Sequence, residues 1–348
     1  MAQDKKSISL QILNILKKHS DVNHKLSQSD IMTYLKKEYD QEGIDGRTIN
    51  SNIDMLNEYL DDAIEFGVNK VKDSKRGIVE KRHSFYIIRD FDESELRLLI
   101  DSVLSSKSIP DGQCDQLLDK LRNEASSNFK YKKNLIKRYT SGLKGNDELF
   151  TSIEVIGEAI DEYKKITFNY AQYDINKKLV NKIDDKTGKD KIYTLTPLRM
   201  VVNNGRYYLF GVPDIYDDLS IYRLDRIKNA NKLEEAGKSK DKIKELKDGM
   251  DLGKHIAEHI FMTLGPSETI IFEFKKGDIS FVIDWFGKDI ELKMKDENTC
   301  IGRVKVNVKS FVNWLMMCSF IEAKVTEPKA VVDEVKARAK QISKLYSK

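Results

Sequence analysis

The sequence contains little cysteine and no long apolar run. Its three cysteines, Cys114, Cys300 and Cys318, lie far apart and match no CxxC or other spacing that holds zinc, so we interpret them as reduced and structural. No segment approaches the roughly 20 apolar residues of a membrane-spanning helix, and the start MAQDKKSISL lacks the apolar core of a secretion signal. We therefore expect a cytoplasmic protein without redox chemistry and without a membrane partner.

Motifs of common catalytic sites are also absent. The sequence has no P-loop, no G-x-S-x-G and no dinucleotide-binding fingerprint after a strand. The pairs Asp61-Asp62, Asp184-Asp185 and Asp217-Asp218 are neighbours along the chain, which is typical of turns and not of an acid/base pair. The sequence thus predicts a protein that is not an enzyme and needs no cofactor.

The positive charge is concentrated in one segment. The chain has 348 residues, which favours two or three domains, and a net charge of only +4. Residues 70–82 contain two acidic residues, Asp73 and Glu80, and six basic ones: Lys70, Lys72, Lys75, Arg76, Lys81 and Arg82. A local excess of this kind indicates a local anionic partner.

Residues 1–91 have the pattern of a winged helix-turn-helix domain. Apolar residues at helical spacing predict a first helix from Ile8, and a second capped by Ser27 or Ser29. In IDGRTINSNIDMLNEYL a third helix places Ile49, Ile53, Leu56 and Leu60 on one narrow arc. The segments AIEFGV and IVEKRHSFYIIRD then predict two strands joined by the basic turn NKVKDSKRG.

The outward face of the third helix changes from polar to acidic along its length. Phosphates would repel Asp54 and Glu58 near its end, so the N-terminal half is the part suited to a major groove. The candidate DNA contacts are Arg47, Thr48, Asn50 and Ser51 in the helix, and Lys70, Lys72, Lys75, Arg76, Lys81 and Arg82 in the wing. The alternative is a generic helical domain whose charged hairpin is simply solvated.

The rest of the chain divides into four further segments. Residues 92–149 alternate apolar and charged positions around a turn at Pro110-Asp111-Gly112, which predicts a helical connector serving as relay, spacer or dimer contact. Residues 150–232 contain the short strands KITFNY, IYTLTPLRMVV, RYYLFGV and LSIYRL of a small β-barrel. Residues 233–265 are interpreted as a charged, solvated linker with a short helix. Residues 266–348 follow the βαββαβ order of a ferredoxin-like domain with an added helix.

These parts in this order resemble the bacterial WYL-domain transcriptional regulators over essentially the whole chain. The family pattern of a Pro, Gly-Arg-(Trp/Tyr)-Tyr-Leu-x-Gly and Arg-x-Phe-Arg-Leu-Asp-Arg-Ile appears here as Pro197-Leu198-Arg199-Met200, Gly205-Arg206-Tyr207-Tyr208-Leu209-Phe210-Gly211 and Ser220-Ile221-Tyr222-Arg223-Leu224-Asp225-Arg226-Ile227. Two positions depart from it: Tyr207 replaces Trp, and Ser220 stands where many members carry an arginine. In the head, the family's frequent Arg-Arg-Thr-(Val/Ile)-x-Arg-Asp run appears as Gly46-Arg47-Thr48-Ile49-Asn50-Ser51-Asn52, so Ser51 replaces an arginine expected to contact DNA. The resemblance implies a multi-domain α+β chain with an Sm-like barrel.

The resemblance also implies a function. It predicts a homodimeric regulator that binds a double-stranded DNA operator and senses a single-stranded nucleic acid or nucleotide in its barrel. Arginine holds phosphates by paired bonds and tyrosine rings stack on bases, so both residue types suit such a ligand. The candidate ligand residues are Arg199, Arg206, Tyr208, Ser220, Tyr222, Arg223 and Arg226. Alternation along the strand places Arg206, Tyr208 and Phe210 on one face and Tyr207 and Leu209 on the other, of which one is expected to be core.

Two other functions remain open from the sequence. A nucleic-acid-binding accessory protein of an anti-phage or CRISPR-associated system would fit the same residues. A zinc hydrolase is suggested by His255-Ile256-Ala257-Glu258-His259, which matches the H-x-x-E-H order of inverted zinc peptidases. We interpret this motif as a linker helix, because no third ligand accompanies it, and expect no metal.

Overall fold

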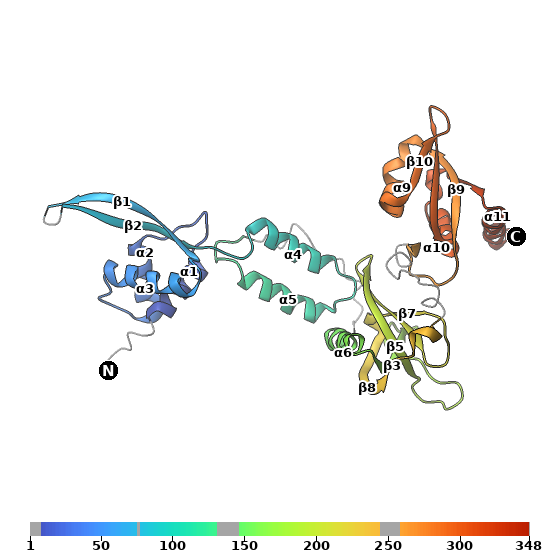
Figure 1. The fold of residues 1–348 in the computed structure, drawn as a ribbon, viewed down its shortest axis with the longest axis horizontal. Coiled ribbons are helices and arrows are strands. Elements are labelled where there is room, and N and C mark those ends of the chain that lie inside the picture. The colour runs from blue at the N-terminus through green and yellow to red at the C-terminus, as the bar shows by residue number, and fades with distance from the viewer. Residues whose placement is uncertain (1–7, 75–76, 131–145, 244–257, 348) are drawn as a thin grey trace. The chain divides into compact units, whose positions relative to one another are not determined.

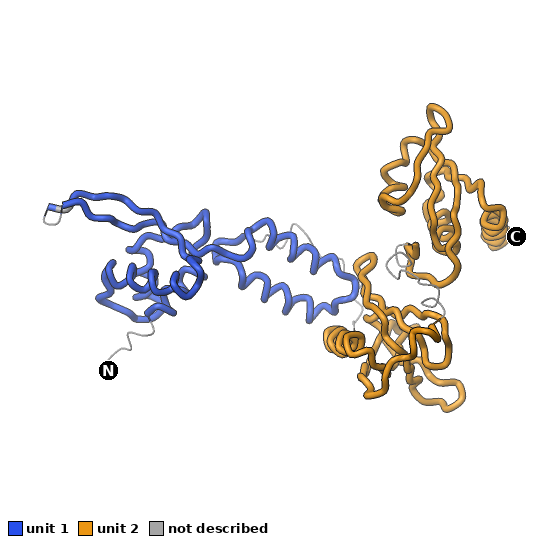
Figure 2. The backbone as a smooth tube through the Cα atoms, viewed as in Figure 1, with its two compact units in different colours: residues 1–143 blue, residues 144–348 orange. Residues whose placement is uncertain are grey.

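The protein is a mixed α+β chain of several domains. The computed structural model describes residues 8–74, 77–130, 146–243 and 258–347. The chain divides into two compact units, residues 1–143 and 144–348 (Figure 2), and each unit is described by itself. None of the helices in the described ranges has the length and apolar character needed to cross a membrane.

The first unit begins with three helices and a hairpin. The helices are α1 (Ile8–His19), α2 (Gln28–Tyr39) and α3 (Gly46–Tyr59), and the antiparallel strands are β1 (Ile64–Asp73) and β2 (Gly77–Ile87) (Figure 1). Ser27 caps α2 in a capping box with Asp30, so of the two expected caps the first is the one used. Ile49, Ile53 and Leu56 are buried as predicted, whereas Leu60 is exposed because it lies at the C-cap, where α3 has already ended.

The hairpin is longer than the sequence suggested. The basic segment expected to be a turn lies mostly within the strands, because the ladder continues to Lys72 opposite Ile78 and Asp73 opposite Gly77. A two-stranded ribbon with both faces in water needs no alternation of apolar residues, so its charged strands resemble a loop in the sequence. We refer to this hairpin as the wing.

The helical connector follows the wing within the same unit. Helices α4 (Glu93–Ser105) and α5 (Asp111–Asn123) pack through a small cluster that contains Leu96, Ile100, Cys114 and Leu118. Pro110 is the N-cap of α5, so Asp111 and the glycine after it belong to the first turn of the helix and not to the turn predicted between the helices.

A polar joint fixes the three-helix head to the connector. The Arg89 guanidinium donates to the carbonyl oxygens of Glu124 at 2.6 Å and Ser20 at 3.1 Å, and also to that of Lys17. The Asp21 carboxylate accepts a hydrogen bond from the Ser126 hydroxyl at 2.6 Å. Main-chain and side-chain groups on both sides are therefore held together.

The second unit begins with a helix and a curved sheet. After α6 (Leu149–Asp161) come β3 (Lys164–Tyr173), β4 (Leu179–Asn181), β5 (Ile192–Asn203), β6 (Arg206–Pro213), β7 (Ser220–Arg223) and β8 (Ile227–Ala236). The sheet order is β4-β3-β5-β6-β7, and β8 pairs with β3. One 3-10 turn, η2 (Leu224–Arg226), links β7 at one side of the sheet directly to β8 at the other. Three residues span only about 10 Å, so the sheet must curl upon itself as a barrel does.

Strand β8 and helix α6 were not predicted. The charged stretch from Leu233, interpreted as a solvated linker, is strand as far as Ala236, and Ile243 beyond it is fully buried. Lys232 of β8 has partners at the C-terminal end of α6: its ammonium lies 3.0 Å from Glu158 and 2.6 Å from Glu162, the C-cap. Charged residues that find partners on a neighbouring helix conceal β8 in the sequence pattern.

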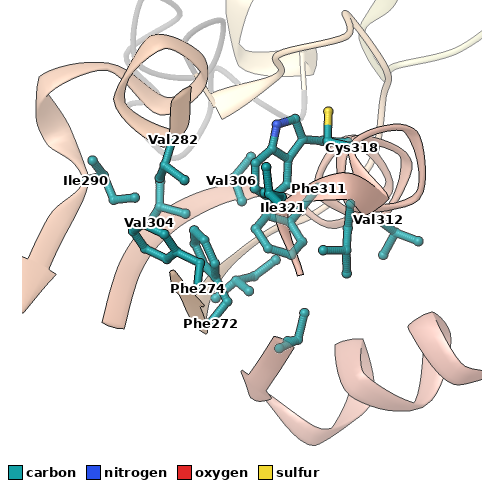
Figure 3. Close-up of a cluster of buried hydrophobic side chains, with 14 of the residues drawn as sticks. Phe272, Phe274, Val282, Ile290, Val304, Val306, Phe311, Val312, Cys318 and Ile321 are labelled. Atoms are coloured by element: carbon teal, nitrogen blue, oxygen red, sulfur yellow. The ribbon is translucent and has the colours of Figure 1, made fainter. Parts of the chain in front are cut away.

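The C-terminal part has the predicted βαββαβ order. It contains β9 (Ser267–Lys275), α9 (Ile279–Phe286), β10 (Glu291–Met294), β11 (Thr299–Asn307), α10 (Val308–Met317), β12 (Lys324–Glu327) and α11 (Lys329–Tyr346). All sheet pairs are antiparallel, in the order β10-β11-β9-β12. Phe272 and Phe274 of β9 face Val282 of α9 and Phe311 of α10 in one apolar core (Figure 3).

Candidate functional site

The hairpin between β5 and β6 positions the first candidate ligand residue. Asn204 and Gly205 both adopt positive φ angles, 49° and 71°, as a two-residue turn between twisted strands requires. Gly211, at the other end of β6, lies where an added Cβ would meet the Thr196 carbonyl oxygen at 2.7 Å. The two glycines of the Gly-Arg-Tyr-Tyr-Leu-x-Gly motif thus set a tight turn and a close strand contact, with Arg206 directly after the turn.

Three charged side chains form the centre of the site, which we call the arginine cluster. Arg223 donates to Asp225 twice, from Nε at 3.0 Å and from Nη2 at 2.5 Å. Arg206 reaches the same carboxylate at 3.3 Å. Two guanidinium groups share one carboxylate, so the cluster keeps a net positive charge. Asp225 thus pairs with Arg223 and with Arg206 from the neighbouring strand.

The surroundings of Arg223 keep it charged. Burial by itself lowers the pKa of its guanidinium, but the hydrogen bonds and the charge of Asp225 outweigh this, and the pKa is raised above its ordinary value. Tyr208 lies opposite Arg223 in the ladder of β6 and β7, and the Tyr170 hydroxyl accepts a hydrogen bond from the Arg223 main-chain N–H at 3.2 Å. A fixed positive charge and two phenols therefore meet at one place.

A cluster of aromatic rings adjoins this place. Tyr222 lies edge-on to Phe168, Tyr170 and Tyr193, with ring centroids 5.2, 5.3 and 5.8 Å away. We call these four residues the tyrosine cluster. Burial raises the pKa of the Tyr222 phenol, an effect partly opposed by its hydrogen bond with Ser220. Ser220, which stands where an arginine was expected, thus orients a tyrosine and supplies no charge.

Two lysines complete the positive surroundings of the tyrosine cluster. Lys182 lies over the Tyr170 ring at 5.7 Å from its centroid, and Lys191 lies over the Tyr193 ring at 5.2 Å. Neither these lysines nor Tyr170 and Tyr193 were among the predicted ligand residues. The spacing of Phe168 and Tyr170, two residues apart on one strand face, was the available signal.

Two predicted ligand residues lie outside the arginine cluster. Arg199 is exposed on β5, opposite Phe210 of β6. Arg226 follows Asp225 in η2, and its buried Nε has no hydrogen-bond partner among the described residues.

Neither face of β6 is simply core. Leu209 and Phe210 are both fully buried although they point to opposite faces, whereas Arg206, Tyr207 and Tyr208 are all half-buried. The expectation that one alternating set would be core is therefore wrong. The sheet is curled and α6 packs against β3, β5 and β8, so burial depends on position along the strand as well as on face.

In the head, some residues predicted to contact DNA are exposed, and others already have hydrogen-bond partners within the protein. Arg47 and Ser51 are exposed on α3. The Thr48 hydroxyl donates to Asp45, the N-cap, at 2.8 Å, and the Asn50 side-chain oxygen accepts from Gln28 at 2.8 Å. Thr48 and Asn50 are thus partly committed to contacts within the head.

The predicted DNA contacts on the wing also differ, in the compensation of their charge and in the face on which they lie. Arg82 forms an ion pair with Asp54 of α3 at 2.5 Å and lies over the Phe66 ring at 4.4 Å, so its charge is largely compensated. Alternation from Arg82, which faces Val68, places Lys70 and Lys72 on the same face of the wing, whereas Lys81 lies on the opposite face. Lys75 and Arg76 lie outside the described residues.

The H-x-x-E-H segment shows no sign of a metal site in the described residues. His255 falls outside them, while His259 is fully buried with Nε2 3.4 Å from the Gly265 carbonyl oxygen. Glu258 forms an ion pair with Lys305 at 3.1 Å. Among the residues the structure describes, no group of three or more His, Cys, Asp or Glu side chains is arranged to hold a metal.

Comparison with known proteins identifies the barrel. Residues 151–231, which begin in α6 and end in β8, match the family model described as WYL domain. A solved structure of proteasome accessory factor B/C (PafBC) of Arthrobacter aurescens is similar at 13% identity and a TM-score of 0.26, over 95% of this chain and 47% of that one. This chain thus spans about half the length of PafBC. No curated protein matches the chain. The match over α6 and the barrel strands shows that residues 151–231 of this chain are a WYL domain.

Proposed function

We propose that this chain is a DNA-binding transcriptional regulator whose WYL barrel binds an anionic ligand derived from nucleic acid. The arginine cluster carries the ligand part of the proposal, because its two guanidinium groups share a single carboxylate beside the tyrosine cluster. Planar guanidinium groups suit phosphate oxygens and phenol rings suit bases. A short single strand or a nucleotide offers both groups at once.

The wing and α3 support the DNA part. The Arg82–Asp54 ion pair ties the wing to the recognition helix, and the exposed Lys70 and Lys72 lie on that same wing face. Phosphates flanking a major groove occupied by α3 would then meet these two lysines. We propose that the protein acts as a homodimer that contacts two half-sites.

The DNA part is tested by charge changes on the two wing faces. Lys70→Ala with Lys72→Ala should lower affinity for all duplex sequences and reduce the slope of log affinity against log salt by up to about 2, since each phosphate contact contributes about 0.9. Lys81→Ala, on the opposite face, serves as the matched control and should change both quantities less. Equal effects from the two faces would contradict this orientation of the wing.

The ligand part is tested by two changes of opposite sign. Asp225→Asn removes the carboxylate that both arginines share, so it should strengthen binding of a short oligothymidylate. Adding Arg206→Gln and Arg223→Gln to that variant should weaken binding at least about tenfold relative to wild type, without leaving a carboxylate unpaired. Lys186→Ala in an exposed turn is the control.

Fluorescence titration with labelled DNA and RNA strands measures both effects. Unchanged affinity in the triple variant would exclude the arginine cluster as the ligand site. A strong preference for single-stranded RNA over duplex DNA would instead favour the accessory-protein function in an anti-phage or CRISPR-associated system.

A further inference from the structure

A cavity of about 540 Å³ lies within the first unit, where the head meets the connector. On the head side it is lined by Val22, which follows α1, and by Tyr86 and Ile88 at the end of β2. On the connector side it is lined by Phe91 just before α4 and Phe129 after α5. Its volume falls within the roughly 300–1,000 Å³ typical of small-molecule sites.

The walls of this cavity expose apolar surface that packing has not covered. Val22, Ile88 and Phe91 are 62%, 51% and 41% exposed, although each belongs to a wall of the same cavity. Apolar side chains exposed together in this way mark a surface that a ligand can cover favourably, because covering it removes apolar atoms from water. A ligand with an apolar body would fit these walls.

The charge at the cavity is negative. Four carboxylates line it, those of Asp21, Glu65, Asp92 and Glu93, against the single guanidinium of Arg89. Arg89 directs its terminal nitrogens at main-chain carbonyl oxygens, and Asp21 and Asp92 accept hydrogen bonds from neighbouring groups in the chain. Glu65 and Glu93 are exposed, and only one Glu65 oxygen accepts the Tyr86 hydroxyl. These two carboxylates can therefore receive a cation from the solvent.

The aromatic walls also favour a positively charged ligand. Ring faces attract cations, and Tyr86 already has the Lys25 ammonium 4.7 Å from its ring centroid. Phe91 and Phe129 add two further rings from the connector side. Carboxylates and ring faces around one apolar cavity suit an organic cation and repel the anions that the barrel would attract.

We propose that this cavity is a second ligand site, specific for a small organic cation such as an arylalkyl amine. The ammonium group pairs with Glu65 and Glu93, and its apolar body packs against Val22, Ile88 and Phe91. Because both head and connector line the cavity, an occupant adds contacts across the joint that Arg89 and Asp21 already form. The site is independent of the barrel and of the ligand proposed there.

Calorimetric titration of the full chain with two probes of equal size and opposite charge tests the proposal. Phenethylammonium should bind and 3-phenylpropionate should not. Glu65→Gln with Glu93→Gln keeps the shape of the cavity and removes both solvent-facing charges, so it should weaken phenethylammonium binding roughly tenfold. Phe91→Ala should weaken it as well, through lost apolar contact and ring face. Asp115→Asn, an equivalent exposed change on α5 outside the cavity, should leave affinity as in wild type.

Three results would overturn the proposal. They are no binding of phenethylammonium, equal binding of the two probes, and unchanged phenethylammonium affinity in the double glutamine variant. A fourth measurement locates the effect: phenethylammonium should raise the unfolding temperature of wild type and not that of the double variant.

Discussion

The side-chain amide of Asn50 is held in one orientation by a second amide. Gln28 Nε2 donates to the Asn50 oxygen at 2.8 Å and lies 3.4 Å from the Gly46 carbonyl oxygen. Asparagine recognises adenine by using its oxygen and its NH2 group together. With the oxygen engaged by Gln28, an Asn50 that contacts DNA as proposed would offer its NH2 group, which requires a base acceptor such as those of guanine or thymine.

This orientation leads to a prediction about sequence preference. Gln28→Ala should release the Asn50 oxygen and shift the preferred base at one operator position towards adenine, which sequencing of DNA selected from a random pool would reveal. Gly46→Ala should act in the same direction, because its Cβ would come within 2.7 Å of Gln28 Oε1 and displace that flexible amide. The same preferred base in all three proteins would show that the amide pair does not set specificity.

A second residue-scale prediction concerns Tyr222 at high pH. Burial raises the folded-state pKa of its phenol above the unfolded value of about 10. The stability that follows from this shift is complete below pH 10 and is lost as pH rises through the folded pKa. Tyr222→Phe should lower stability at neutral pH by about 1 kcal/mol, because the hydrogen bond with Ser220 is lost, and should flatten the decline above pH 10.

Chemical unfolding curves between pH 8 and about 11 would check this. Tyr216→Phe, which removes an exposed hydroxyl, is the control. Identical slopes for wild type and Tyr222→Phe in the alkaline range would mean that Tyr222 is not the titrating group.

At the scale of elements, the sequence predicted most strands and helices but not all of the barrel. Helices with an apolar stripe, such as α3, and strands with apolar runs, such as β9, were visible in the sequence and are present. Strand β8 was missed because its charges pair with α6, and the wing strands were shortened because no core imposes alternation on them. The periodicity of apolar residues in a sequence reflects burial of one face. Strand β8 and the wing strands are only partly buried, so they show little of it.

The candidate site was predictable from the sequence only for the residues that belong to the family motif. Arg206, Arg223 and Asp225 come from a recognisable motif and do meet. Tyr170 and Tyr193 reach Tyr222 from other strands, and that meeting depends on how the sheet curls, which pattern alone does not specify. Likewise the pairing of Asp54 with Arg82 joins a helix to a strand 28 residues away.

The joint between head and connector gives an element-scale prediction. Burial by itself would raise the pKa of Asp21, but hydrogen bonds from Ser126, His24 and the main chain outweigh it and lower the pKa. The resulting stability is present above the unfolded pKa and is lost as pH falls through the folded pKa. Asp21→Asn should cost roughly 1–3 kcal/mol at neutral pH and make the first unit less sensitive to acid.

Urea unfolding at pH 7 and at about pH 3 would measure both effects, with Asp115→Asn on α5 as the control. An equal loss for the two variants would show that the Asp21 contacts add nothing specific to the joint. A loss at pH 7 that persists undiminished in acid would contradict the assigned titration.

At the scale of the whole molecule, barrel and head should influence each other. If an oligothymidylate changes affinity for an operator fragment by some factor, that fragment must change affinity for the oligothymidylate by the same factor. Paired titrations in both orders test this, and the Arg206→Gln, Arg223→Gln, Asp225→Asn variant should lose the coupling while keeping DNA affinity. No change in either titration would mean that the two binding activities are independent.

The three cysteines have a use that follows from where they lie. Cys114 belongs to the apolar cluster between α4 and α5, whereas Cys300 and Cys318 belong to the core around β9 and α10, and all three are buried. Burial raises the pKa of the Cys318 thiol, which slows its reaction further. Each thiol can be alkylated only when its own cluster opens. The rates of alkylation at these native cysteines would therefore report the local opening of the connector and of the C-terminal domain separately, without any engineered substitution.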